Sequence, residues 1–290
     1  MYRWYGLDEV PAGWGRCVVT IGKFDGVHLG HQRVIAAAAE TGLVPTVVTF
    51  HPHPRIALGY GVELLSTLER RLELFAEHGV EETLVVNFDH ELQQCEPEEF
   101  ARDVLGAMGT RVVVAGETFR FGHRRRGDLA LLRELGFDAR ASPFLEGVSS
   151  TEIRRLLHEG DVAGAAALLG RPPEVEGTVV VGDERGGTLG FPTANLAVQA
   201  QLLVPAFGIY AGSALARPAA ISIGTNPHYG GLERKVEAFL LDFDGDLYGQ
   251  RLVVELWQRL RDEQAFENEQ ALIDQIARDV AATRAAVRPG

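Results

Sequence analysis

The feature that most constrains the fold is a glycine-rich run that joins an apolar segment to an alanine-rich helix. The run covers residues 22–31, Gly-Lys-Phe-Asp-Gly-Val-His-Leu-Gly-His, and follows the β-branched residues 18–21. Small residues let a phosphate group approach the backbone, and a helix start supplies N–H groups and a positive dipole. His28 and His31 are spaced to face one side of the first helical turn. The run predicts a strand, a turn and a helix that together bind nucleotide phosphates.

The first half of the chain alternates between strand and helix signals. Short β-branched runs predict strands at residues 18–21, 46–50, 84–87 and 112–115. Helical patterns lie between them at residues 31–40, 68–78 and 97–108. Such alternation predicts an α/β fold, with a parallel, Rossmann-like sheet covered by helices on both faces. Ligands bind at the carboxyl ends of the strands in such sheets, where residues 22–31 would lie.

A change of pattern near residue 171 predicts a domain boundary. Another helix opens where Ser149 and Glu152 fit a capping box, and Asp161 caps a short one that follows. An Arg-Pro-Pro step then breaks the helical pattern. We therefore expect an N-terminal domain of residues 1–170 and a C-terminal domain of residues 171–290.

The second half of the chain is predicted to form short strands separated by Gly, Pro and Asp clusters. The strands are expected at residues 175–181, 209–214, 219–223, 236–241 and 252–256. Strands without intervening helices predict a small antiparallel β-barrel. Apolar residues then recur at helical spacing near the end of the chain, which predicts an amphipathic helix packed on the barrel. They are Leu272, Ile273, Ile276 and Val280.

Composition narrows the class of protein. The net charge of −12 argues against nucleic acid as the main partner, because phosphate-backbone binding needs a basic face. Two distant cysteines, Cys17 and Cys95, favour reduced thiols. No apolar run approaches the ~20 residues of a membrane span, and the N-terminus has no apolar signal core. We expect a cytoplasmic protein, and its oligomeric state stays open.

Four motifs in the first domain, taken in order, resemble one family. They are residues 22–31, the Thr-Phe-His-Pro-His-Pro run at 49–54, Gly-Glu-Thr-Phe-Arg-Phe-Gly at 116–122, and Val-Ser-Ser-Thr-Glu-Ile-Arg at 148–154. The second domain adds Gly-Phe-Pro-Thr-Ala-Asn at 190–195 and Val-Glu-Ala-Phe at 236–239. The set resembles the prokaryotic bifunctional riboflavin kinase/FAD synthetase family over nearly the whole chain.

The resemblance implies an FMN adenylyltransferase in residues 1–170, which would convert FMN and ATP to FAD and pyrophosphate. His28 and His31 would donate hydrogen bonds to phosphate oxygens as charge develops on them. The residues implied in ATP binding are Gly22, Phe24, Asp25, Gly26, Gly30, Ser150, Thr151 and Arg154. Thr118 and Phe119 would contact the flavin. The family usually has Asp, Asn or Glu at His51, and Asp or Asn at Thr118, where the shorter, uncharged Thr predicts weaker flavin contact.

The resemblance also implies a riboflavin kinase in residues 171–290, which would convert riboflavin and ATP to FMN and ADP. Thr193 and Asn195 would hold Mg²⁺ with the nucleotide, since Mg²⁺ prefers oxygen ligands. Glu237 would be the base for the ribityl 5′-hydroxyl. The kinase nucleotide loop would comprise Gly182, Arg185, Gly186, Gly190 and Pro192.

Three other functions compete with that of a bifunctional flavin enzyme. His51 and Thr118 leave room for a riboflavin kinase whose adenylyltransferase is weakened or inactive. A flavin-binding regulator would need a basic DNA-reading module, which the acidic sequence lacks. An adenylyltransferase for a pantetheine or a nicotinate ribotide would leave the second domain unexplained. Read alone, the His-x-x-His spacing also fits part of a metal site, and Ser149–Ser150–Thr151 fits a simple helix cap.

Overall fold

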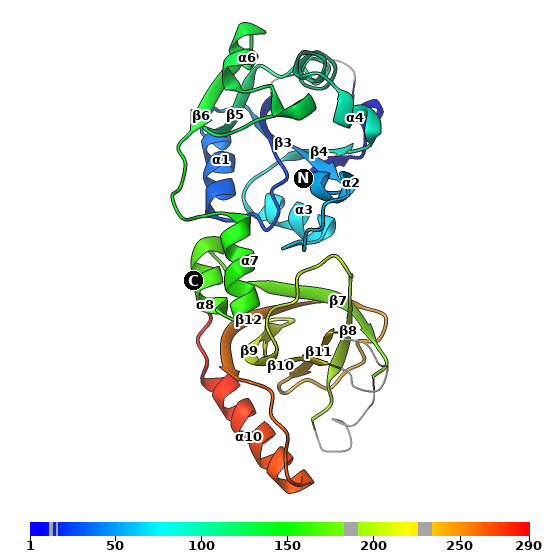
Figure 1. The fold of residues 1–290 in the computed structure, drawn as a ribbon, viewed down its shortest axis with the longest axis vertical. Helices are drawn as coiled ribbons and strands as arrows, with labels where there is room; N and C mark the ends of the chain where they lie inside the picture. Colours follow the sequence, from blue (N-terminus) through cyan, green and yellow to red (C-terminus); the bar gives the residue numbers. More distant parts are fainter. Residues whose placement is uncertain (12–13, 16, 183–190, 226–233) are drawn as a thin grey trace. The chain divides into compact units, whose positions relative to one another are not determined.

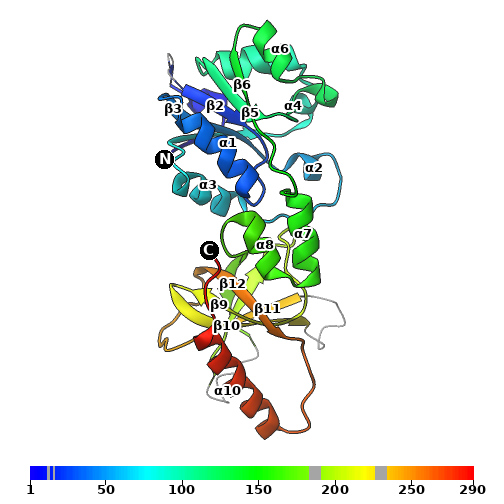
Figure 2. The same cartoon turned by 90° about the vertical axis from the view of Figure 1, so that its left-hand side faces the viewer.

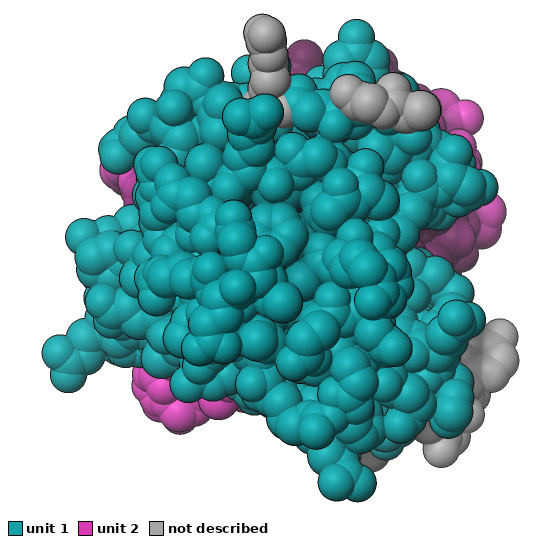
Figure 3. Space-filling model, turned by 90° about the horizontal axis from the view of Figure 1, so that it is seen from above, with its two compact units in different colours: residues 1–62, 67–148 teal, residues 63–66, 149–290 magenta. Residues whose placement is uncertain are grey.

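The computed structural model describes residues 1–11, 14–15, 17–182, 191–225 and 234–290. The chain forms two compact units, coloured separately in Figure 3: unit 1 contains residues 1–62 and 67–148, and unit 2 contains residues 63–66 and 149–290. Unit 2 thus includes two helices that lie before the boundary expected at residue 171, α7 (Ser150–Glu159) and α8 (Val162–Leu169).

Unit 1 is built on a six-stranded parallel sheet, as the alternation of strand and helix signals predicts (Figure 1). The strands run in the spatial order β1-β4-β3-β2-β5-β6. Their bounds are β1 Tyr2–Trp4, β2 Cys17–Ile21, β3 Val44–His51, β4 Glu82–Asn87, β5 Val112–Gly116 and β6 Asp138–Ser142. The order changes direction around β2, which pairs with β3 on one side and β5 on the other.

Helices cover both faces of this sheet. Successive strand residues point to opposite sides, and apolar side chains on both sides have to be buried. On β2, Val18 packs in one apolar cluster with Ala38, while its neighbour Val19 packs in another with Leu105. One face is covered by α1 (Leu29–Ala39) and α3 (Leu68–Glu77), which Figure 2 brings to the front. The other face is covered by α5 (Pro97–Phe100), the turn η2 (Ala101–Gly106) and α6 (Leu129–Glu134).

The helix expected at residues 97–108 changes its winding part of the way along. Pro97 occupies its first turn, and Glu96 and Glu99 form a capping box there. After Phe100 the backbone continues as the wider π-helix η2. The shorter elements of unit 1 are the helices α2 Pro54–Ala57 and α4 His90–Gln94 and the 3₁₀ turns η1 Leu7–Glu9 and η3 His123–Arg125.

Unit 2 is a closed six-stranded antiparallel barrel, in agreement with the sequence prediction, with strand order β10-β11-β8-β7-β12-β9. The strands are β7 Glu174–Val180, β8 Ala194–Val198, β9 Gly208–Ala214, β10 Arg217–Thr225, β11 Arg234–Leu240 and β12 Arg251–Arg261. On β11, Val236, Ala238 and Leu240 are buried, whereas Lys235 and Glu237 alternate with them and are only half-buried. The barrel therefore has an apolar interior and a polar outer wall.

Helices α7 and α8 belong to the core of the barrel. Their residues Ile153, Leu157, Val162, Ala165 and Leu169 share one apolar cluster with the barrel interior. Ser149 caps α7, with its Oγ accepting the N–H of Glu152 at 3.2 Å. The Glu152 carboxylate forms an ion pair with Arg155, so only the Ser149 half of the expected capping box is formed.

The terminal helix α10 (Glu269–Ala285) packs on β9 and β10, as expected. Its buried residues are Asp279 and Thr283. The residues expected to pack on the barrel, Leu272, Ile273, Ile276 and Val280, are only partly buried. Asp279 is buried with its charge paired, because its carboxylate accepts from Arg261 of β12 at 2.7 Å. In the described parts of the chain, no helix combines the length and the apolar character that crossing a bilayer requires.

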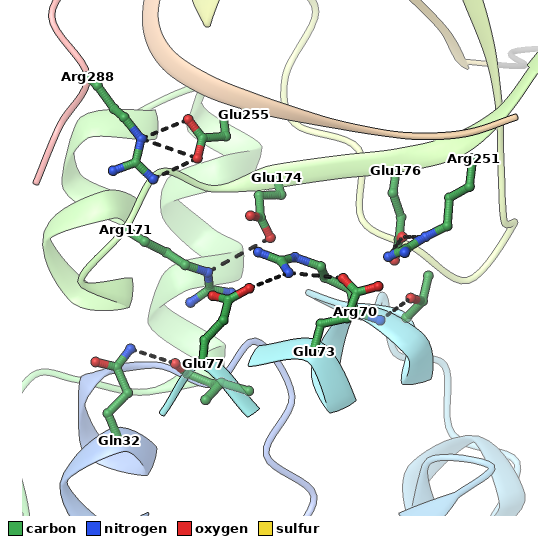
Figure 4. A network of polar contacts seen from close by, with 12 residues as sticks. Gln32, Arg70, Glu73, Glu77, Arg171, Glu174, Glu176, Arg251, Glu255 and Arg288 are labelled. Carbon is green, nitrogen blue, oxygen red and sulfur yellow. Dashed lines mark hydrogen bonds and ion pairs between the residues drawn. The ribbon is translucent and has the colours of Figure 1, made fainter. Parts of the chain in front are cut away.

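Ion pairs also tie strands and the C-terminal tail together within unit 2 (Figure 4). Arg288 in the tail binds both carboxylate oxygens of Glu255 on β12, and Glu255 also accepts from Ser213 of β9 at 3.0 Å. Arg251 of β12 pairs with Glu176 of β7 at 2.5 Å. These pairs hold the barrel strands and the last residues in register.

Candidate active sites

Three of the predicted motifs leave the sheet of unit 1 at one edge. Strands β3, β2 and β5 are parallel neighbours, so the loops that follow their carboxyl ends share that edge. These loops begin at residues 22, 52 and 117. The edge lies where the strand order changes direction, which is where open α/β sheets bind their ligands.

The loop after β2 has an unusual backbone. Phe24 and Val27 have φ angles of 52° and 41°, in the left-handed region that non-glycine residues rarely adopt, and Gly26 has 80°. Each such non-glycine residue stores about 1–3 kcal/mol of strain, and strain of this kind clusters at functional sites. At Gly30, a Cβ would lie 3.2 Å from the ring of His28. Any larger residue at position 30 would therefore press on the His28 ring, which would have to shift by a few tenths of an ångström.

The two histidines form a stacked pair, with ring centroids 3.6 Å apart and planes 16° apart. His28 caps α1, and its Nδ1 accepts the backbone N–H of His31 at 3.3 Å. In the neutral ring this acceptor role assigns the proton to Nε2. In this tautomer His28 carries its donor proton on Nε2 at the start of the helix.

His31 is held in its neutral form. Burial lowers the pKa of His31 well below its usual value, and electrostatic interactions with His28, Lys23 and Arg71 lower it further. Its Nδ1 is buried and has no hydrogen-bond partner among the described residues. The edge of the Phe24 ring lies against it, with centroids 5.1 Å apart. A buried polar atom without a partner is costly, so the ring is poised to meet a ligand.

Arg71 of α3 is a member of this site that the sequence analysis missed. Its side chain is 4% exposed, and it donates to the backbone carbonyls of Lys23 and Phe50. Asp25, 3% exposed, attracts the guanidinium. A signal was present in the sequence, because Arg71 continues the apolar stripe Leu68, Leu72 and Phe75, which is otherwise the core face of α3.

The loop after β5 supplies aromatic surface. Phe119 stacks on Phe121 with centroids 5.5 Å apart and planes 12° apart, and Phe121 packs on Phe100. The Phe119 N–H donates to the carbonyl of Gly116 at 2.9 Å, which closes a turn directly after the strand. Thr118 at the tip of this turn is exposed. The arrangement offers flat apolar area beside one small hydroxyl.

The remaining predicted ATP ligands, Ser150, Thr151 and Arg154, lie in the first turns of α7, within unit 2. The Arg154 Nε donates to the carbonyl of Glu63 at 2.6 Å, inside the same unit. Because His28 and His31 belong to unit 1, joint action of these residues on one nucleotide stays a prediction.

Two of the predicted kinase residues lie side by side on the outer wall of the barrel. Asn195 of β8 and Glu237 of β11 are directly opposite each other in the antiparallel register, so their side chains share one face. The Glu237 carboxylate accepts from Lys235 at 2.6 Å. Phe191 packs edge-on against Phe239, two residues beyond Glu237.

Asn195 is oriented with an oxygen to spare. It is 8% exposed, and its Nδ2 donates to the carbonyl of Thr193 at 3.4 Å. Its Oδ1 is buried with no hydrogen-bond partner among the described residues. Gly182 lies so close that a Cβ there would fall 2.2–2.5 Å from the Asn195 amide atoms. Pro192 is exposed, and Arg185, Gly186 and Gly190 lie outside the described residues.

Two further polar residues of this wall were not predicted. Lys235 pairs with Glu237, as described above. Glu263, which follows β12, covers Gly224 of β10 so closely that a Cβ at Gly224 would fall 2.1 Å from its Oε1. Burial raises the pKa of the Glu263 carboxyl, and nearby Arg261 opposes the rise. No local motif distinguishes these two residues from ordinary surface charges.

Comparison with known proteins covers both units. The family model described as FAD synthetase matches residues 10–146, and the one described as riboflavin kinase matches residues 169–287. A bifunctional riboflavin kinase/FMN adenylyltransferase from Escherichia coli K12 is 38% identical, with 95% of this chain and 93% of the relative covered. The protein of the same name from Bacillus subtilis 168 is 33% identical, with 91% and 90% covered.

One solved structure is similar to this chain over nearly its whole length. A Streptococcus pneumoniae chain described as a macrolide-efflux protein has a TM-score of 0.86 and 30% identity to this chain, with 97% of this chain and 98% of that one covered. Both domain models match in the order that the sequence motifs imply, and the relatives match along nearly the whole chain. The chain belongs to the bifunctional riboflavin kinase/FMN adenylyltransferase family.

Proposed function

We propose that this chain makes two flavin cofactors in succession, and that the residues described above carry both reactions. Riboflavin and ATP give FMN and ADP, and FMN and a second ATP give FAD and pyrophosphate. The observation that carries this function is the presence of both family domains in one chain with bifunctional relatives along its length. The kinase-only alternative gains no support, because the FAD synthetase domain is matched over residues 10–146.

In adenylyl transfer, a phosphate oxygen of FMN attacks the α-phosphorus of ATP, and pyrophosphate leaves. The backbone around Gly22, Gly26 and Gly30 would cradle the phosphates. His28 would donate from Nε2 to an α-phosphate oxygen, and His31 would donate beside it. We assign the remaining nucleotide contacts to Phe24, Asp25, Ser150, Thr151 and Arg154, and the flavin contacts to Thr118 and Phe119.

In phosphoryl transfer, the riboflavin 5′-oxygen attacks the γ-phosphorus of ATP, and the bond to the β-phosphate oxygen breaks. Glu237 would take the proton from the 5′-hydroxyl, with Lys235 holding its carboxylate in place. The buried, unpaired Oδ1 of Asn195 fits a Mg²⁺ ligand, and Thr193 adds a hydroxyl beside it. Bound Mg²⁺ would neutralise phosphate charge. Gly182, Arg185, Gly186, Gly190 and Pro192 would form the loop over the nucleotide.

We assign the two activities to residues 1–170 and 171–290. We place both in the cytoplasm, because ATP is a substrate of each. The two cysteines, Cys17 and Cys95, form no disulfide, which suits a reducing compartment. The partners that the two proposed reactions require are small molecules: ATP, riboflavin and FMN.

The test uses the full-length protein with riboflavin, ATP and Mg²⁺, and separates the flavins over time. The unaltered chain should form FMN and then FAD. His31→Ala should stop at FMN, because loss of one preorganised donor typically costs about 10²–10³-fold in rate. Glu237→Gln should make little FMN, with a loss of about 10²–10⁴-fold, yet convert supplied FMN to FAD. Normal output from either variant would remove that residue from its role.

A further inference from the structure

Arg71 is the most deeply buried cation of the described residues that the family motifs do not include. It lies on α3, a helix that contributes none of the predicted site residues. A buried charge is costly unless it is paired and hydrogen-bonded, so its retention needs an explanation. Burial lowers the pKa of Arg71 to about 10, while the Asp25 carboxylate opposes the drop. The guanidinium therefore stays charged at neutral pH.

The partners of Arg71 join two loops of the adenylyl-transfer site. Its Nη1 donates to the carbonyl of Lys23, directly before the left-handed residue Phe24. Its Nη2 donates to the carbonyl of Phe50, at the end of β3, at 3.4 Å. Thr49 of the same strand also donates to the Lys23 carbonyl, at 3.4 Å. One cation thus fixes the start of the strained loop to the neighbouring strand.

The charge of Arg71 also acts on the histidine pair. After burial, the groups that lower the pKa of His31 are His28, Lys23 and Arg71. These groups come from the loop after β2 and from α3, the elements around the ring. Arg71 is one of the charges that oppose protonation of His31.

We propose that Arg71 is the positioning residue of the adenylyl-transfer site. Its buried guanidinium fixes the loop of residues 22–31 in the conformation that aims His28 and His31 at the nucleotide. This inference rests on the proposed role of the two histidines. Arg71 does not act on substrate directly in this arrangement, and a side chain that only filled space could not replace it.

The experiment compares Arg71→Met and Arg71→Lys with the control Arg70→Met in the full-length chain. Arg70 is the adjacent arginine of α3 and pairs with Glu73 at 3.0 Å and Glu77 at 2.8 Å (Figure 4). The kcat and KM of FAD formation from FMN are measured, together with riboflavin phosphorylation as an internal measure of intact unit 2. Proton NMR follows the titration of the His31 ring.

Arg71→Met should lower kcat of FAD formation by about 10- to 100-fold, because small misplacement of reacting groups costs that much. The KM for ATP should change less than kcat, and riboflavin phosphorylation should persist. His31 should titrate at higher pH, because an opposing positive charge is gone. Arg71→Lys should recover most of the kcat and the His31 titration, and Arg70→Met should behave as the unaltered chain.

Unaltered kcat and His31 titration in Arg71→Met would overturn the proposal. Equal losses of kcat in Arg71→Lys and Arg71→Met, with no change in the His31 titration, would also overturn it. The shape of the arginine side chain, and not its charge, would then be what matters. If Arg71→Met does not fold, Arg71→Gln takes its place as the uncharged variant, and the same outcomes support or overturn the proposal. Activity that survives in His31→Ala would instead refute the proposed role of the histidine pair, whatever Arg71 does.

Discussion

At the scale of single residues, the position of the Asn195 side chain depends on the absence of a side chain at Gly182. Asn195 fills the space where any Cβ of residue 182 would lie. The glycine is therefore required by close approach, and its φ is not in the left-handed region. The asparagine amide reaches its position only because its neighbour has no side chain.

Asn195→Ala removes a proposed Mg²⁺ ligand of the kinase site. Gly182→Ala should cause the same defect by displacing the Asn195 amide, although residue 182 itself supplies no side-chain ligand. We expect FMN formation to fall at least about tenfold in both, since a displaced ligand misaligns the reacting groups. More Mg²⁺ should be needed for half-maximal rate, and FAD formation from FMN should be unchanged. Rates measured across a Mg²⁺ series check this, with Val181→Ala at the adjacent exposed position as control. A Gly182→Ala variant with an unaltered Mg²⁺ dependence would contradict it.

The sequence predicts residues whose function depends on local spacing. His28 and His31 are close along the chain, and the structure stacks them. Arg71 and Lys23 are 48 positions apart, so no local pattern links them. Glu263 and Gly224 are likewise brought together only by the closure of the barrel. Contacts of this kind depend on tertiary structure, which spacing alone does not reveal.

At the scale of elements, buried strands rich in β-branched residues can be predicted from the sequence. Strands with polar or turn-like sequences, such as β6 and β8, cannot. β2 to β5 are rich in buried, β-branched residues and were found. β6 has the sequence Asp-Ala-Arg-Ala-Ser at the sheet edge, where polar residues are tolerated. β8 begins inside the Pro-Thr-Ala-Asn motif, which alone resembles a turn. The strand that carries Asn195 was therefore missed.

The helices α7 and α8 decide which fragment of the barrel can fold. A fragment of residues 172–290 lacks five of their side chains that belong to the barrel core. Burial of a Val, Leu or Ile side chain stabilises a fold by about 1.5–3 kcal/mol, and Ile153, Leu157, Val162 and Leu169 together rival the ~5–15 kcal/mol of a whole domain. We expect residues 149–290 to melt cooperatively and phosphorylate riboflavin. The shorter fragment should aggregate, and equal melting temperatures in calorimetry would contradict this expectation.

At the scale of the whole molecule, each unit has its own apolar core, and the proposed catalytic residues His31 and Glu237 lie in different units. FMN, the product of one reaction, is the substrate of the other. An FMN released by one chain should therefore serve the adenylyl-transfer site of another chain.

Mixing His31→Ala with Glu237→Gln should restore FAD synthesis from riboflavin. Neither variant alone should complete both steps, but the first makes FMN and the second consumes it. A lag should precede FAD and shorten as the His31→Ala concentration rises. Chromatography of the flavins follows the time course, with each variant alone as control. A mixture that accumulates FMN without FAD would show that FMN does not reach the second chain.

The segment of residues 63–66 has a consequence for the exchange of domains between relatives. The chain leaves unit 1 after Val62, contributes this segment to unit 2 and returns at Thr67 before its final departure at residue 149. Leu64 exchanges backbone hydrogen bonds with Gln201 and Leu203, and Glu63 pairs with His158 at 2.7 Å. A chimera joined at a single crossover would therefore pair a foreign barrel with a native segment. Recombination that preserves stability would have to exchange residues 63–66 along with the barrel.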